Sequence, residues 1–280
     1  MHPDHSSRSR TVWVGRQRLR VTVENAGRGR PLLLINGIGA TGDLFDPFRQ
    51  FLDDRETIAF DAPGVGRSST PVLPTTMGQL SDIVAGLARQ LGHEQVDALG
   101  LSWGGALAQE LAHRHPRLVN RLVLAATMPG WAGVPGQIGA LSILMSPARY
   151  FSPDYLRRVA PTLYGGAIVD HPHLLDEHAR QRTTHRPSLL GYLYQLMAIQ
   201  GWTSVHWLRR LRPPTLVLAG DDDPIIPVAN GRILADRIPN GRLHVVEGGG
   251  HLFLVVRGEE MASLVRRFLD TGGPEDSGAG

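Results

Sequence analysis

Residues 96–105 read Val-Asp-Ala-Leu-Gly-Leu-Ser-Trp-Gly-Gly, in which an apolar run passes directly into a G-x-S-x-G motif. The run over 96–100 is too continuous for a half-exposed strand and predicts a buried parallel strand. Residues 104–115 predict a helix, which Pro116 ends. A serine on so tight a strand-to-helix turn points its hydroxyl out of the sheet. The stretch therefore predicts Ser102 as a nucleophile at the carboxyl end of a strand.

Outward from this stretch, short apolar runs alternate with helical segments. The opening runs, 11–14 and 19–24, flank the turn residues Gly15-Arg16-Gln17-Arg18 and predict an antiparallel hairpin. Alternation of strands and helices predicts an α/β fold, a mostly parallel twisted sheet with helices on both faces. The other predicted parallel strands are Leu32–Asn36, Thr57–Asp61, Leu122–Ala126, Thr215–Ala219 and Leu243–Val246.

One interval is far longer than a single crossover helix requires, since about 90 residues separate the strands at 122 and 215. Residues 130–206 are predicted to form an inserted helical lid, while 11–129 and 207–270 form the core. The segments 1–10 and 271–280 are polar and predicted to be disordered. The insert holds eight of the 17 aromatic side chains, which could line a substrate site or fill the core of a small helical unit.

A serine nucleophile needs a base and a carboxylate that orients the base. In a fold of this kind they follow the serine in the order acid then histidine, at the ends of later strands. His251 follows the last predicted strand on a glycine loop, which makes it the preferred base. Three consecutive carboxylates follow the strand at 215–219, and the residues alone leave the acid open among Asp221, Asp222 and Asp223.

Two backbone N–H groups are predicted to stabilise an oxyanion beside Ser102. One belongs to Trp103, because the first N–H groups of a helix point toward the group that the serine attacks. The other belongs to Ile38, in the glycine-rich loop 36–40 after an early strand. The glycines that are predicted to give this turn and this loop their room are Gly37, Gly100 and Gly104.

Composition excludes several kinds of chemistry. The chain of 280 residues has no cysteine and no lysine, which removes thiol nucleophiles, Schiff bases and the P-loop lysine. The net charge is only +3, and the arginines are scattered among 26 acids, so no nucleic acid partner is expected. Neither His113 and His115 nor His171 and His173 stand in a metal-ligand pattern, so no metal or other cofactor is expected.

No apolar run approaches the roughly 20 residues of a membrane span, so no transmembrane segment is expected. The polar start MHPDHSSRSR lacks the apolar region of a secretory signal. A cytoplasmic location is therefore expected.

Together these residues resemble the α/β-hydrolase superfamily. From about residue 11 to 269 the chain is similar to the intracellular poly(3-hydroxyalkanoate) depolymerases that act on medium-chain-length polymer. The resemblance implies Ser102 as nucleophile, Asp223 as acid and His251 as base, with the N–H groups of Ile38 and Trp103 as oxyanion donors. The stretches that carry it are LLLINGIGA, FDAPGVGRSSTP, ALGLSWGGALAQELAH, LVLAAT, PTLYGGA, GWTSVHWLRRLRPPTLVLAGDDDPIIP, RIPNGRLHVV and GHLFLV.

The resemblance implies a serine ester hydrolase that cleaves a polyester through an acyl-enzyme, with the surface of a storage granule as a partner. The same residues also suit a general carboxylesterase, a perhydrolase or a carbon–carbon bond hydrolase. A ligand-binding protein that keeps a hydrolase fold without catalysis is the alternative outside the enzymes.

Overall fold

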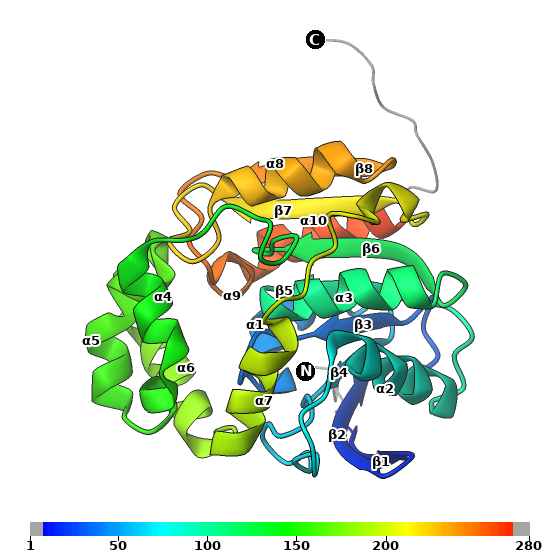
Figure 1. The fold of residues 1–280 in the computed structure, drawn as a ribbon, viewed down its shortest axis with the longest axis horizontal. Coiled ribbons are helices and arrows are strands. Elements are labelled where there is room, and N and C mark those ends of the chain that lie inside the picture. Colours follow the sequence, from blue (N-terminus) through cyan, green and yellow to red (C-terminus); the bar gives the residue numbers. More distant parts are fainter. Residues whose placement is uncertain (1–7, 271–280) are drawn as a thin grey trace, which may run out of the picture.

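The computed structural model describes residues 8–270, in which eight strands form one sheet in the order β1-β2-β4-β3-β5-β6-β7-β8 (Figure 1). The β1–β2 and β2–β4 pairs are antiparallel, and the other pairs are parallel. The predicted fold class is confirmed. The strands are β1 Arg8–Val14, β2 Gln17–Glu24, β3 Leu32–Ile35, β4 Thr57–Phe60, β5 Val96–Leu101, β6 Val119–Ala125, β7 Thr215–Gly220 and β8 Gly241–Val246.

The central strands are continuous apolar runs because both faces of the sheet are covered. Along β3, Leu33 and Ile35 enter one core cluster, whereas Leu32 and Leu34 enter the other. Successive side chains of a strand point to opposite faces, so a strand between two helical layers is apolar at most positions on both faces.

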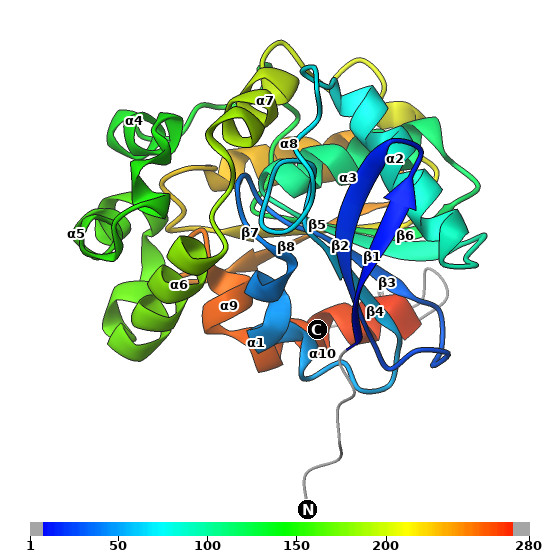
Figure 2. The same ribbon diagram turned by 90° about the horizontal axis from the view of Figure 1, so that it is seen from below.

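Figure 2 shows the two helical layers on either side of the sheet. Helices α2 Met77–Gln90, α3 Trp103–Arg114 and α8 Val228–Arg237 cover one face. Helices α1 Asp46–Arg49, α9 Phe253–Val256 and α10 Gly258–Asp270 cover the other, with the 3₁₀ helix η1 Gly42–Phe45 preceding α1.

Four α-helices lie between β6 and β7 and form a group beside the sheet (Figure 1). Local signals set their starts: the hydroxyl of Ser152 accepts the N–H of Tyr155, and that of Ser188 accepts the N–H of Gly191. The division into core and inserted lid stays a prediction. The elements of this segment are α4 Ile138–Met145, η2 Pro147–Tyr150, α5 Pro153–Tyr164, η3 Gly166–Asp170, α6 Pro172–Thr184, α7 Leu189–Ile199 and η4 Leu208–Arg210.

The N-terminal hairpin is longer than predicted. Arg8 to Arg10, assigned from the sequence to a disordered segment, belong to β1 and pair with 21–23 of β2. The hydrogen bonds offered by β2 extend the strand past the point where its apolar pattern stops. The rest of that segment, residues 1–7, and the tail 271–280 lie outside the described residues. Strands β6 and β8 also begin two to three residues earlier than predicted, at Val119 and Gly241.

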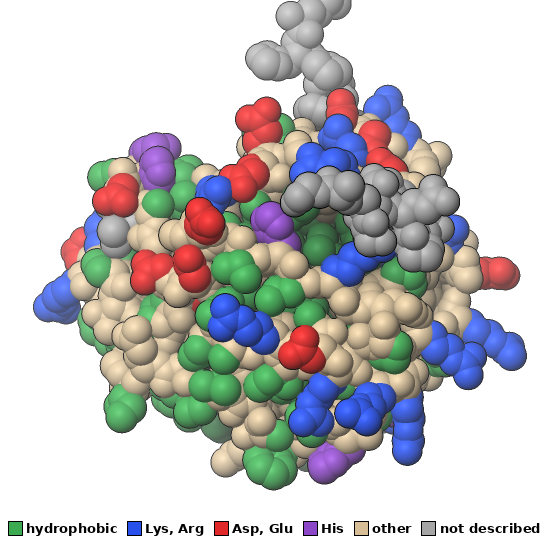
Figure 3. All heavy atoms as spheres, turned by 90° about the horizontal axis from the view of Figure 1, so that it is seen from above, with side chains coloured by type: hydrophobic (Ala, Val, Ile, Leu, Met, Phe, Trp, Pro, Cys, Tyr) green, Lys and Arg blue, Asp and Glu red, His purple; other side chains and the backbone are tan. Residues whose placement is uncertain are grey.

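Two further features of the described chain concern the side chains on its surface and the length and hydropathy of its helices. On the side of the molecule where α8 and β8 lie, acidic and basic side chains lie among scattered apolar ones (Figure 3). Over residues 8–270, no helix is long and apolar enough to cross a bilayer.

Candidate active site

Ser102 occupies a strained turn between β5 and α3. Its φ of 56° and ψ of −119° lie where residues with a side chain are rare. Hydrogen bonds hold it there: its N–H donates to the Ala125 carbonyl at 2.9 Å, and its carbonyl accepts from the Thr127 hydroxyl at 2.7 Å and the Gly105 N–H at 2.9 Å. Strain of this kind persists only where the surroundings over-determine the conformation, as at functional sites.

Two predicted glycines allow this turn to form. A Cβ at Gly100 would collide with the Gly104 carbonyl oxygen, and a Cβ at Gly104 would collide with that of Ile35. Strand and helix therefore approach to a distance that only glycine permits. Gly37 lies beside the nucleophile, since a Cβ there would be 3.5 Å from Ser102 Cβ and 4.0 Å from its Oγ.

The structure brings Asp223 and His251 together although 28 residues separate them. The Asp223 Oδ2 atom lies 2.8 Å from His251 Nδ1, and both side chains are buried. Asp223 Oδ1 accepts the N–H groups of Ile225 and Ile226, each at 2.9 Å. The carboxylate is thus fixed at one oxygen by the backbone and offers the other to the imidazole, as an orienting acid requires.

The neighbouring aspartates are placed differently. Asp222 accepts the N–H of Gly166 at 2.6 Å, and Asp221 is exposed. Asp223 is therefore the acid that the geometry favours.

The loop that carries His251 rests on the end of α5. The N–H of His251 donates to the carbonyl of Tyr164 at 2.7 Å, and Gly250 lies against Gly165 so closely that a Cβ would not fit. Among residues 8–270, no hydrogen bond joins the His251 ring to the Ser102 hydroxyl. Catalytic hydrogen bonds are often long without substrate and tighten in the complex.

The two predicted oxyanion donors belong to buried residues next to Ser102. Trp103 is the first residue of α3, where an N–H has no partner within the helix. In the described part of the chain, no backbone hydrogen bond outside the helices and strands uses the N–H of Ile38 or of Trp103. Both residues line the same cavity as Ser102, and their N–H groups stay the predicted oxyanion donors.

An apolar cavity of about 320 Å³ opens on this site and includes Ser102, Ile38 and Trp103 in its wall. Such a cavity suits an aliphatic group attached to a carbonyl at Ser102. Its apolar lining includes Ala106, Met128, Leu141, Leu144, Leu196 and Ile199.

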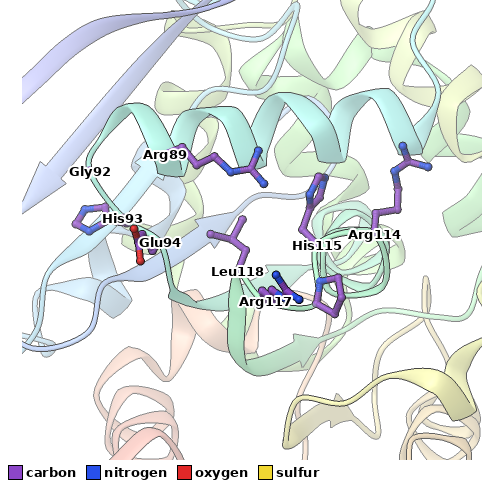
Figure 4. Close-up of a pocket in the computed structure, with 9 residues that line it drawn as sticks. Arg89, Gly92, His93, Glu94, Arg114, His115, Arg117 and Leu118 are labelled. Carbon is purple, nitrogen blue, oxygen red and sulfur yellow. The ribbon is translucent and has the colours of Figure 1, made fainter.

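A second hollow, of about 720 Å³, lies at the opposite end of the sheet near the starts of β5 and β6 (Figure 4). It is lined by basic side chains such as Arg89 and Arg114, in the last turns of α2 and α3, where positive charge offsets the helix dipole. Arg114 and His115 also pair with Asp82. This hollow contains no nucleophile of the kind that Ser102 provides.

No arrangement of three or more histidine and acidic side chains in residues 8–270 could hold a metal ion. The rings of His171 and His173 meet edge to face with centroids 6.0 Å apart, and His113 stacks on Trp207.

Sequence reasoning missed the side chains that support the oxyanion loop. Tyr150 donates to the Ile38 carbonyl at 2.5 Å, and Gln195 accepts the N–H of Gly39 at 2.7 Å. The aromatic side chains of the insert divide between the two predicted positions, a core and a cavity wall. Tyr150, Tyr164 and Tyr192 are buried, whereas Trp131 is exposed and lines the apolar cavity. No local pattern separates these roles.

A buried arginine, Arg149, and a half-buried one, Arg182, lie against this tyrosine cluster. The guanidinium groups of Arg149 and Arg182 lie over the Tyr150 ring, and Arg182 donates to the Tyr150 hydroxyl and to His178. Burial, followed by the charges of Arg182 and Arg149, holds the pKa of His178 well below its ordinary value of 6.5. His178 is therefore neutral in the folded protein.

Comparisons with known proteins agree with this architecture. The sequence model described as the alpha/beta hydrolase family matches residues 32–264. The chain is 47% identical over 263 residues to the poly(3-hydroxyalkanoate) depolymerase of Ectopseudomonas oleovorans, covering 93% of this chain and 92% of that protein. It is 30% identical to the 2-hydroxymuconate semialdehyde hydrolase of Pseudomonas putida, covering 91% and 94%.

Among solved structures, the enol-lactonase of Burkholderia xenovorans superposes with a TM-score of 0.79 at 24% identity, covering 93% of this chain and 99% of that one. This likeness concerns the fold. The resemblance found in the sequence is confirmed, and the chain belongs to the alpha/beta hydrolase family.

Proposed function

We propose that the chain is a serine esterase that cleaves the ester bonds of a medium-chain-length poly(3-hydroxyalkanoate). The identity to a poly(3-hydroxyalkanoate) depolymerase supports ester hydrolysis. The observation that carries the substrate class is the apolar cavity with Ser102 in its wall, because aliphatic side chains of such a polyester would fill it.

The proposed reaction is acyl transfer. His251 takes the Ser102 proton as the oxygen attacks the ester carbonyl, and Asp223 stabilises the imidazolium that forms. The N–H groups of Ile38 and Trp103 receive the negative oxygen. His251 then protonates the leaving alcohol, and water releases the acyl group as a 3-hydroxy acid or a short oligomer. This chemistry requires no metal and no organic cofactor.

The exposed apolar side chains of helix α7 support the proposal that the protein contacts a polymer surface. Leu196 and Ile199 line the cavity, whereas another side of the helix exposes large apolar side chains by 45 to 62%. The exposed set is Leu189, Leu190, Leu193 and Met197. A contiguous apolar surface beside a site marks an interaction region, and we propose the surface of a polymer granule as its partner.

Hydrolysis of emulsified poly(3-hydroxyoctanoate) and of p-nitrophenyl esters from acetyl to decanoyl tests the function. We expect polymer turnover, a maximum at medium acyl length, and a loss of at least about a thousandfold in Ser102→Ala. A flat acyl profile without polymer turnover would assign a general carboxylesterase. Cleavage of a vinylogous diketone in place of esters would assign carbon–carbon bond hydrolysis.

A pair of variants tests the surface contact. Leu189→Ser with Leu193→Ser should lower polymer turnover and sedimentation with granules, while turnover of soluble p-nitrophenyl butyrate stays the same. Trp13→Ser, which removes an exposed aromatic on β1, is the matched control and should change neither. Equal polymer turnover in both variants would refute the role of α7.

A further inference from the structure

The predicted donor Ile38 lies in a tight turn whose central peptide has two possible orientations. The Ala40 N–H donates to the Gly37 carbonyl at 3.1 Å, and Gly39 has φ +66°, which are features of a type II turn over 37–40. Type I and type II turns differ by a flip of the peptide that joins their two central residues, here Ile38 and Gly39. What fixes that peptide therefore fixes ψ of Ile38 and the direction in which the carbonyl of the predicted donor residue points.

Two side chains from the segment between β6 and β7 hold this peptide at both ends. The Tyr150 hydroxyl donates to the Ile38 carbonyl at 2.5 Å, and the N–H of Gly39 donates to Gln195 Oε1 at 2.7 Å. Both side chains are buried, at 0% and 3% exposure. A flipped peptide would leave its carbonyl and its N–H without partners in a buried place, which is unfavourable.

Further hydrogen bonds hold both residues in place, at the side chain of Tyr150 and at the main chain of Gln195. Arg182 donates to the Tyr150 hydroxyl, so the single hydroxyl proton is left for the Ile38 carbonyl. The main-chain carbonyl of Gln195 accepts the indole N–H of Trp103 at 3.0 Å. Gln195 on α7 thus contacts Trp103, one of the two predicted donors, and Gly39, the residue that follows the other donor, Ile38.

We propose that Tyr150 and Gln195 are positioning residues that hold the oxyanion hole in its reactive geometry before substrate binds. This inference rests on the proposed function at Ser102. Preorganised donors stabilise a transition state because they need no reorganisation when charge develops. The segment between β6 and β7 would therefore contribute to catalysis as well as to substrate binding.

The test compares Tyr150→Phe and Gln195→Met with Tyr192→Phe. Tyr192 is the matched control, because its buried hydroxyl also accepts from an arginine, Arg149, and donates to a backbone carbonyl, that of Leu144, which lies outside the oxyanion loop. All three variants should lose stability. Only the first two should lose kcat on p-nitrophenyl butyrate, by about tenfold, less than the hundredfold or more for loss of a whole donor.

Three further readouts separate positioning from a purely structural role. KM should change less than twofold in Tyr150→Phe and Gln195→Met, whereas inhibition by an alkyl boronic acid, whose tetrahedral adduct fills the oxyanion hole, should weaken by the same factor as kcat. Gln195→Glu, which keeps an acceptor for the Gly39 N–H, should recover most of kcat. Circular dichroism at the assay temperature checks that each variant is folded.

Unchanged kcat and unchanged boronic acid affinity in folded Tyr150→Phe and Gln195→Met would overturn the inference. So would an equal loss of kcat in Tyr192→Phe. Ser102→Ala separates this failure from that of the proposed function: if it keeps wild-type activity, the function at Ser102 is wrong. If it is inactive while the two positioning variants are fully active, only the positioning role is wrong.

Discussion

Replacing Asp223 with asparagine should remove the acid of the proposed triad and leave its backbone contacts in place. In the structure, Asp223 Oδ1 accepts two N–H groups at 2.9 Å and Oδ2 faces His251 Nδ1 at 2.8 Å. The amide oxygen of asparagine must stay on the two N–H groups, so its NH₂ group faces His251. The ring then carries its proton on Nε2, the atom that must accept the proton of Ser102.

The expected loss in kcat is about ten-thousandfold. A loss of this size follows the same replacement in the triad of a serine protease, where the histidine takes the wrong tautomer. The free energy of unfolding should change little in Asp223→Asn, because shape and backbone hydrogen bonds are kept. Asp223→Ala should differ, since it leaves two buried N–H groups unpaired at about 1–3 kcal/mol each. The two variants therefore separate catalysis from stability.

The assay is steady-state turnover of p-nitrophenyl butyrate, together with urea unfolding followed by circular dichroism. Asp221→Asn is the control, because that carboxylate is exposed and two residues away, and it should keep kcat within about threefold of wild type. The reasoning is refuted if Asp223→Asn retains a tenth or more of the wild-type kcat with an unchanged unfolding midpoint.

Three further predictions concern other parts of the molecule. Gly104→Ala should lower the free energy of unfolding, measured in urea, by more than about 2 kcal/mol and should abolish activity, because the new Cβ would collide with backbone atoms. Gly78→Ala in α2 is the control and should leave the free energy of unfolding unchanged or raise it. Burial keeps His178 neutral in the folded protein, so only the unfolded chain takes up a proton there as the pH falls below 6.5, and the free energy of unfolding falls with it. His178→Gln should remove this part of the pH dependence, which amounts to at most about 1.4 kcal/mol per pH unit. Urea titrations at pH 5 to 8 measure it. Leu141→Trp should fill the cavity and lower kcat/KM for the decanoyl ester about tenfold more than for the acetyl ester, and equal losses would count against the cavity as the acyl site.

The strands and the nucleophile turn were predictable from the sequence because their signals are local. A strand covered on both faces is apolar at most positions, as 96–100 is apart from Asp97, and a turn that brings two backbones together needs glycine at 100 and 104. Boundaries were less predictable, since β1 begins at Arg8 only because the backbone of β2 offers it partners. The order of Ser102, Asp223 and His251 was also readable, because each follows a predicted strand.

The residues alone left open which aspartate faces His251, although the resemblance implied Asp223, and only the tertiary structure decided what holds the loop of Ile38 and Gly39. Three adjacent aspartates look alike in the sequence, and only the fold turns the Asp223 carboxylate toward an imidazole 28 residues away. Gln195 reaches a loop N–H 156 residues before it. A hydrogen bond between such distant residues leaves no periodic pattern and no turn signal in the chain, because it depends on where two segments meet in space.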